Sequence, residues 1–172
     1  LYFLGNKMKI AEISPYDFAH PGGVQRHISS LSSELVLRGH DVSVIGPCSK
    51  STPLVNLENV NFVPLGRSIP FPTAGSIARI SSSLWHEWKL KSFLQTENFD
   101  IVHIHEPLMP LTSLTAATFS RSTTIGTFHA YNEGRSKGYI LGKRLRLLER
   151  FANRLDGRIA NLSSNLSLLP KI

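Results

Sequence analysis

Short β-branched and apolar runs alternate along the chain with longer segments in which apolar residues recur every three or four positions. The first pattern predicts strands, and the second predicts amphipathic helices. The predicted strands are Lys9–Ser14, Asp41–Gly46, Val60–Leu65, Ile101–His105, Thr123–Thr127 and Gly157–Ala160. The predicted helical segments are Val24–Leu35, Ser76–Thr96, Leu108–Ser120, Gly138–Leu155 and Ser163–Leu169. Gly39 is predicted to stop the first helix, and the Pro- and Gly-rich stretch Gly66–Gly75 is predicted to be loop.

This alternation predicts an α/β fold with a doubly wound, mostly parallel Rossmann-like sheet that carries helices on both faces. In such sheets ligands bind outside the carboxyl ends of the strands. The residues that follow each predicted strand are therefore the candidates for function.

Composition narrows the class of protein. The 172 residues fit one domain, predicted to span 8–172, with residues 1–7 interpreted as a tag remnant. No apolar run approaches the roughly 18–20 residues that would cross a bilayer. Cys48 is the single cysteine, which excludes an intrachain disulfide and agrees with a cytoplasmic location. The net charge of +7 favours phosphate-bearing partners, although a mildly basic soluble domain without such a partner would have the same balance.

Two adjacent glycines, Gly22 and Gly23, lie after the first predicted strand, where a helix begins. Backbone N–H groups and the helix dipole at such a place attract an anion such as a phosphate. A glycine pair is also common in turns that bind nothing. It is neither a P-loop nor the Gly-x-Gly-x-x-Gly motif of dinucleotide-binding domains.

Histidines follow two further predicted strands. His103 and His105 alternate within one strand, so their side chains share a face of the sheet beside Glu106. No further cysteine or aspartate completes a ligand set, so no metal site is predicted and His103 is given a structural role. His129 follows Thr123–Thr127, and a neutral imidazole there can exchange a hydrogen bond with a sugar hydroxyl or orient a reacting group.

Together, Pro21-Gly22-Gly23-Val24, His103-Ile104-His105-Glu106-Pro107 and Thr127-Phe128-His129 resemble the N-terminal domain of family 4 retaining glycosyltransferases, which have the GT-B fold. The resemblance covers nearly the whole chain. It is closest to the phosphatidylinositol mannosyltransferases, through Gln25 and the run Gly75-Ser76-Ile77-Ala78-Arg79.

The resemblance implies a role for each of these positions. Gly22 and Gly23 would contact the donor diphosphate, and His129 would contact the transferred sugar near the reaction centre. The residues that would face the acceptor are Tyr16, Gln25, Ser76 and Arg79. Thr73-Ala74 departs from the Tyr-Asn pair of the lipid enzymes, which leaves a different inositol lipid, another polyol or a growing glycan open as the acceptor.

The implied reaction transfers a hexose, with mannose favoured, from a nucleotide-diphosphate sugar to an acceptor hydroxyl with retention. GDP-mannose is the favoured donor and a UDP-sugar the alternative, and no cofactor or metal is required. The C-terminal domain that would complete the donor site is expected to be absent from the chain, which we expect to be inactive alone.

The Ser76–Thr96 segment carries Trp85, Trp88, Lys89 and Lys91, a mixture that suits weak contact with an anionic membrane. The basic face formed by Lys143, Arg146, Arg150 and Arg154 fits the same role or a solvated helix surface. Together with the resemblance, these features imply a cytoplasmic enzyme that can lie on the inner face of the cell membrane.

Two other classes of protein stay open. A non-catalytic nucleotide- or anionic-lipid-binding module would share the fold and the charge. A dehydrogenase or epimerase domain is disfavoured because Gly-x-Gly-x-x-Gly is missing, and nucleic acid is not an expected partner because aromatic RNA-binding motifs are absent.

Overall fold

The computed structural model describes residues 6–73, 76–81, 83–129 and 151–160. Most of the predicted helix Gly138–Leu155, the predicted turn Ser163–Leu169 and the predicted basic face other than Arg154 lie outside these residues. The elements in chain order are β1 (Lys9–Ile13), α1 (Gly23–Leu37), β2 (Asp41–Gly46), β3 (Asn61–Pro64), β4 (Ser68–Thr73), β5 (Ser76–Ser81), α2 (Leu84–Thr96), β6 (Ile101–His105), α3 (Thr112–Phe119), β7 (Thr123–Phe128) and β8 (Gly157–Ala160).

The main sheet has six strands in the order β3-β2-β1-β6-β7-β8, and all the neighbouring pairs are parallel. The chain builds outward from β1 to β3 and then crosses back to build outward from β6 to β8. This is the doubly wound order, and the direction reverses between β1 and β6. The predicted fold class is confirmed, and the reversal point marks where a ligand site is expected.

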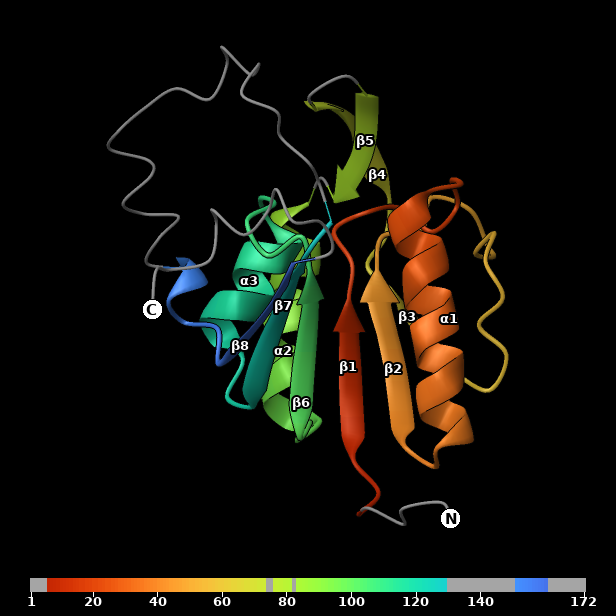
Figure 1. Ribbon diagram of the computed structural model, residues 1–172. Coiled ribbons are helices and arrows are strands. Elements are labelled where there is room, and N and C mark those ends of the chain that lie inside the picture. The colour runs from red at the N-terminus through yellow and green to blue at the C-terminus, as the bar shows by residue number, and fades with distance from the viewer. Residues whose placement is uncertain (1–5, 74–75, 82, 130–150, 161–172) are drawn as a thin grey trace.

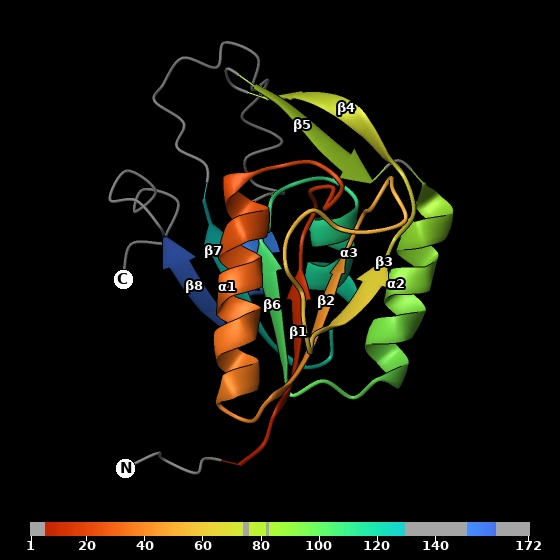
Figure 2. The ribbon, with the colours of Figure 1, turned by 90° about the vertical axis from the view of Figure 1, so that its right-hand side faces the viewer.

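The molecule has three layers, with α1 on one face of the sheet and α2 and α3 on the other (Figure 2). The larger core cluster fills the α2–α3 side and draws alternate residues from the central strands, among them Ala11, Ile13, Val102 and Ile104. Because side chains in a strand alternate between the faces, the residues between them point toward α1.

Helix α1 ends where the sequence predicts. Gly39 has a φ of +91°, and its N–H donates to the carbonyl of Val36, while the N–H of His40 donates to the carbonyl of Leu35. These two bonds satisfy carbonyls of the last helical turn. A residue with a β-carbon is strained at this backbone angle, so glycine suits the stop.

The prediction of loop for Gly66–Gly75 and of helix from Ser76 is wrong. Strands β4 and β5 pair antiparallel as a separate hairpin that stands above the carboxyl ends of the main sheet (Figure 1). Pro70 and Pro72 are compatible with a strand here because both strands of a two-stranded ribbon are edge strands, where a missing N–H need not break the pairing. Helix α2 begins only at Leu84.

The other helix of this side is shorter than predicted, since α3 spans Thr112–Phe119 rather than Leu108–Ser120. Within the described part of the chain, no helix is both long enough and apolar enough to cross a membrane.

Candidate active site

The candidate site lies on the α1 side of the sheet, where the build direction reverses. Glu12 of β1 stands in register with His103 of β6, and His105 stands in register with Thr127 of β7. All four residues are buried, and Glu12 and His105 are 1% and 0% exposed. A row of polar side chains therefore crosses the middle of the sheet beneath its carboxyl edge.

Close contacts join this row into one network. Glu12 Oε2 lies 2.9 Å from His103 Nδ1 and 2.8 Å from His105 Nε2. His103 Nε2 lies 2.7 Å from Thr127 Oγ1, and His105 Nδ1 lies 2.8 Å from His129 Nε2. One carboxylate oxygen thus connects two branches, of which one ends on Thr127 and the other on His129.

His129 lies directly after β7, as the sequence predicts, and its backbone is also held. Its N–H donates to Glu106 Oε1 over 2.7 Å, while the N–H of Glu106 donates to the carbonyl of Thr127 over 2.8 Å. The rings of His129 and of His27 from α1 lie 4.9 Å apart between centroids. The imidazole of His129 is therefore fixed from the sheet, from the β6–α3 turn and from α1.

Electrostatics favour the neutral form of the His105 and His129 rings near pH 7. Burial opposes ionisation of Glu12, but hydrogen bonds from His103 and His105 outweigh it and hold the pKa of this carboxyl below its usual value. Burial lowers the pKa of His105, although the Glu12 carboxylate acts in the opposite direction. Burial, together with the neighbouring rings of His105, His27 and His103, lowers the pKa of His129 to about 4.

Two groups of these side chains come close enough to consider a metal. The ligand atoms of His27, His105 and His129 lie within 4.8 Å of one another, and so do those of Glu12, His103 and His105. Two imidazole nitrogens on one tetrahedral zinc lie about 3.3 Å apart, given Zn–N bonds of about 2.0–2.1 Å. The 2.8 Å between His105 Nδ1 and His129 Nε2 is a hydrogen-bond distance, so this arrangement is a hydrogen-bonded network.

The glycine pair lies at the N-terminus of α1. A β-carbon on Gly22 would come within 2.2 Å of the side-chain oxygen of Gln25, so a side chain there would displace that amide. Among the residues that the structure describes, a β-carbon on Gly23 would meet nothing within 4 Å, and the N-cap residue Gly22 makes no side-chain capping hydrogen bond. Gly23 thus leaves open space beside the positive end of a helix dipole.

The loop between β1 and α1 is tied in place by buried polar groups. Asp17 Oδ1 accepts hydrogen bonds from the N–H groups of Ala19 and Ser49. The amide of Gln25, which is buried, donates to the carbonyl of Asp17 over 3.0 Å. Gln25 therefore supports the loop that leads into the glycine pair.

The other three predicted acceptor residues lie in the hairpin or pair with it. Arg79 is exposed on β5, and its carbonyl accepts a hydrogen bond from the N–H of Asp17. Tyr16 forms an isolated bridge with Ile80, and Ser76 is the first residue of β5. The hairpin thus brings Arg79 to the same loop as Tyr16, although from a strand and not from the helix that the sequence predicts.

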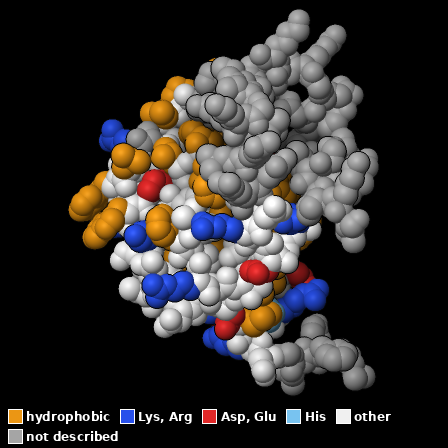
Figure 3. Space-filling view, turned by 90° about the vertical axis from the view of Figure 1, so that its left-hand side faces the viewer, with side chains coloured by type: hydrophobic (Ala, Val, Ile, Leu, Met, Phe, Trp, Pro, Cys, Tyr) orange, Lys and Arg blue, Asp and Glu red, His pale blue; other side chains and the backbone are white. Residues whose placement is uncertain are grey.

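Several exposed apolar side chains belong to this hairpin and to the first turns of α2, and we call this set the apolar rim. Its largest members are Ile77, Leu84, Trp85 and Trp88, and the two tryptophan side chains are 66% and 59% exposed and stack on each other. Figure 3 shows hydrophobic and basic side chains side by side on one face of the molecule. Lys89 is exposed, whereas the ammonium of Lys91 lies 4.3 Å from the centre of the Phe119 ring.

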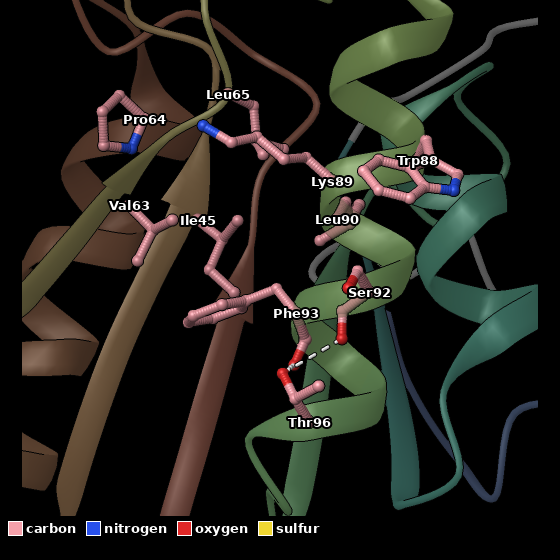
Figure 4. Close-up of a pocket in the computed structure, with 10 residues that line it drawn as sticks. All are labelled: Ile45, Val63, Pro64, Leu65, Trp88, Lys89, Leu90, Ser92, Phe93 and Thr96. Carbon is pink, nitrogen blue, oxygen red and sulfur yellow. Dashed lines mark hydrogen bonds between the residues drawn. The ribbon is translucent and has the colours of Figure 1, made fainter.

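A shallow cavity of about 250 Å³ opens between the β2–β3 edge of the sheet and α2. Its walls are mainly apolar, and Figure 4 shows Trp88 and Lys89 at one end and Phe93 and Thr96 at the other. It contains none of the histidines, so the candidate site lies elsewhere.

Gly126 connects the interior of β7 to the site. A β-carbon there would lie 2.5 Å from Leu155 Cδ1 and 3.0 Å from Pro107 Cγ. Pro107 follows Glu106, whose carboxylate holds the His129 backbone. Glycine at this position lets the β6–α3 turn pack against the sheet.

Two residues of the site, Glu12 and His27, were not among the sequence-based candidates. A charged residue inside the apolar run Lys9-Ile10-Ala11-Glu12-Ile13 is a signal that could have identified Glu12. His27 stands one helical turn after Gly23, so the two residues lie on the same face of α1.

Comparisons with known proteins concern the family and the fold of the chain. A family model described as Glycosyltransferase Family 4 matches residues 21–166. The chain is 36% identical over 156 residues to a phosphatidyl-myo-inositol mannosyltransferase of Propionibacterium freudenreichii, and the match covers 89% of this chain and 40% of that protein. It is 35% identical over 153 residues to the protein of the same name from Mycobacterium tuberculosis, covering 89% and 39%. The chain therefore spans about two fifths of the length of these relatives.

Solved structures support the fold. A glycosyltransferase from Rickettsia africae aligns with a TM-score of 0.54 at 18% identity, covering 84% of this chain and 34% of that one. A sucrose-phosphate synthase from Thermosynechococcus elongatus aligns with a TM-score of 0.57 at 14% identity, covering 88% and 42%. At these identities the likeness concerns the fold alone.

Proposed function

Because the chain belongs to glycosyltransferase family 4, we propose that it forms the acceptor-side half of a retaining enzyme that transfers mannose from GDP-mannose to a phosphatidylinositol-type lipid. The observation that carries this proposal is the 36% identity to a phosphatidyl-myo-inositol mannosyltransferase along 89% of the chain. A further domain supplies the other half of the donor site.

The donor diphosphate binds at Gly22 and Gly23. The open space over Gly23 lets phosphate oxygens approach the first N–H groups of α1, and the helix dipole adds to the attraction. The guanine base and the mannose are the finer part of this proposal, and a UDP-sugar is the alternative that the assay below separates.

His129 binds the transferred sugar. With a pKa of about 4, its imidazole is uncharged near pH 7 and acts through hydrogen bonds. Its ring is held by His105 and its backbone by Glu106, so little rearrangement is needed when the sugar arrives. In this role His129 orients the sugar and forms no covalent intermediate.

The acceptor lies between the β1–α1 loop and the hairpin. Arg79 is exposed there, and its planar guanidinium suits two hydrogen bonds to a lipid phosphate. The proposed acceptor site also includes Tyr16, which is bridged to the hairpin through Ile80, and Ser76, the first residue of β5. Gln25 supports the loop by donating to the carbonyl of Asp17.

The apolar rim brings the enzyme to its lipid. Trp85 and Trp88 suit the membrane interface because each ring pairs an apolar body with a polar N–H, and Lys89 adds attraction to anionic headgroups. In this proposal the protein lies peripherally on the inner face of the cell membrane.

The decisive assay uses the protein expressed from the complete open reading frame, with vesicles of phosphatidylinositol in phosphatidylcholine. Labelled GDP-mannose should transfer its sugar to the lipid fraction with retained configuration, while UDP-glucose should not. Label transferred only from UDP-glucose would reassign the donor. No transfer from any nucleotide sugar, together with a reading frame that ends near residue 172, would favour a binding module.

Membrane contact is tested on the 172-residue chain itself. Vesicles that contain phosphatidylinositol should co-sediment it, and a Trp85→Ala/Trp88→Ala double variant should lose most of this binding. The matched control is Leu37→Ala, since Leu37 is a still more exposed apolar residue and lies at the C-terminal end of α1, outside the apolar rim. Equal binding by all three proteins would remove the apolar rim from the proposal.

A further inference from the structure

Glu12 is the one charged side chain among the described buried residues of β1 and β6, and the proposed chemistry leaves it without a role. A carboxylate that is 1% exposed needs compensation by hydrogen bonds, because burial strips it of water. It receives two, both on Oε2, from His103 and from His105. The second of these leads to His129.

The charge of Glu12 sets the direction of every hydrogen bond in that branch. An ionised carboxylate can only accept, so His105 must donate from Nε2. A neutral His105 has one ring proton, which leaves Nδ1 as an acceptor. The 2.8 Å contact between His105 Nδ1 and His129 Nε2 therefore requires His129 to donate from Nε2.

We propose that Glu12 is a positioning residue that selects the tautomer of His129 through His105, so that His129 carries its proton on Nε2 and accepts a hydrogen bond at Nδ1. The reverse direction would turn the lone pair of His105 Nε2 toward the carboxylate oxygen 2.8 Å away, which is repulsive. The tautomer of His129 does not depend on what the protein does. The effect of this tautomer on sugar transfer rests on the proposed function.

This tautomer restricts the chemistry that Nδ1 can bind. A group that meets Nδ1 of a neutral His129 must donate a hydrogen bond, as a hydroxyl does. A phosphate oxyanion or a carbonyl oxygen cannot. A sugar or polyol hydroxyl meets this requirement, whereas an oxygen of the ionised donor diphosphate does not.

The second branch provides an internal control. His103 connects Glu12 to Thr127 without touching His129, so Thr127→Val removes one hydrogen bond of the network and leaves the His105 branch intact. Glu12→Met removes the carboxylate with an apolar side chain of similar length. Glu12→Gln retains one acceptor oxygen but also adds donors.

The test is nitrogen NMR of the 172-residue chain with ¹⁵N-labelled histidine near pH 7, after chelator treatment to remove adventitious metal. The signal of His129 is assigned from its loss in His129→Asn. We expect a protonated Nε2 and an unprotonated Nδ1 in the wild type and in Thr127→Val. Glu12→Met should give a mixture of both tautomers, and Glu12→Gln a smaller change.

A wild-type His129 with its proton on Nδ1 would overturn the proposal. This measurement needs no variant, so the proposal can be tested even if Glu12→Met does not fold. An unchanged tautomer in a folded Glu12→Met would also overturn it. In the complete enzyme, Glu12→Met should lower kcat about tenfold or more with little change in donor KM. A confirmed tautomer with no transferase activity would refute the proposed function alone.

Discussion

The two faces of the central sheet are made by the same strands and have opposite chemistry. Toward α2 and α3, β1 and β6 present Ala11, Ile13, Val102 and Ile104, all apolar and closely packed. Toward α1, the residues between them form a polar row that ends on His129. Each strand therefore stabilises the domain with one face and builds the candidate site with the other.

The polar face is tolerated in the interior because its groups pair with one another. Glu12, His103 and His105 each have a partner within 2.9 Å, so burial leaves these ring nitrogens and the shared oxygen satisfied. The difference between the faces teaches that apolar substitutions on one side should change stability, and polar substitutions on the other should change activity.

The largest expected effect is on the apolar face. Ile104→Ala removes a fully buried side chain between β1 and β7, and such truncations cost about 2–5 kcal/mol in the free energy of unfolding. Urea denaturation of the 172-residue chain measures it. A loss below about 1 kcal/mol would mean that this face is loosely packed.

His129→Ala should have the opposite profile. In the complete enzyme it should lower kcat at least about tenfold because a contact to the transferred sugar is lost, while the melting temperature changes little. Steady-state kinetics test the loss of activity, and thermal unfolding of the same preparation tests the unchanged stability. Unchanged kinetics would show that His129 has only a structural role, and would contradict the expectation that the polar face of the sheet serves activity.

Arg79→Ala tests whether function extends from the polar face onto the hairpin. We expect a several-fold higher KM for the acceptor with unchanged donor affinity, and only partial recovery in Arg79→Lys, because an ammonium lacks the two-pronged contact. Arg38→Ala, at the opposite end of α1, is the matched control. Weakened donor binding in calorimetric titration would instead assign Arg79 to the nucleotide sugar.

A smaller effect follows from the lowered pKa of His129. His129 has a pKa of about 4 in the folded chain, against about 6.5 for an unperturbed histidine. Between these values the unfolded chain binds more protons, so the free energy of unfolding should fall as the pH falls from about 6.5 toward about 4.

Thermal unfolding of the 172-residue chain across this range measures the slope. His129→Asn should flatten it, because the titrating ring is gone, whereas Leu37→Ala should retain it. Parallel curves for wild type and His129→Asn would show that this ring does not contribute.

The sequence predicted the regular parts of the fold because they follow from local patterns. The β-branched run Ile101–His105 and the stop at Gly39 need no distant partner, and both predictions are confirmed. The hairpin was missed because Pro70 and Pro72 indicate loop locally, and only the pairing of β4 with β5 makes them compatible with strands.

The sequence predicted only those parts of the candidate site that depend on local patterns. His129 and the glycine pair were found because their positions after strands are readable along the chain. The role of Glu12 depends on a register that joins it to His103, 91 residues later, and no local pattern encodes that pairing.

The close packing around Gly126 predicts which mutations a genetic screen would recover. Any β-carbon at this position must displace Leu155 and Pro107, and Pro107 follows the carboxylate that holds His129. A screen for lost transfer should therefore recover alleles at residue 126, and suppressors among smaller side chains at residue 155. Such alleles would show that the packing of β7 affects the position of the His129 ring without direct contact between that ring and the side chains at residues 126 and 155.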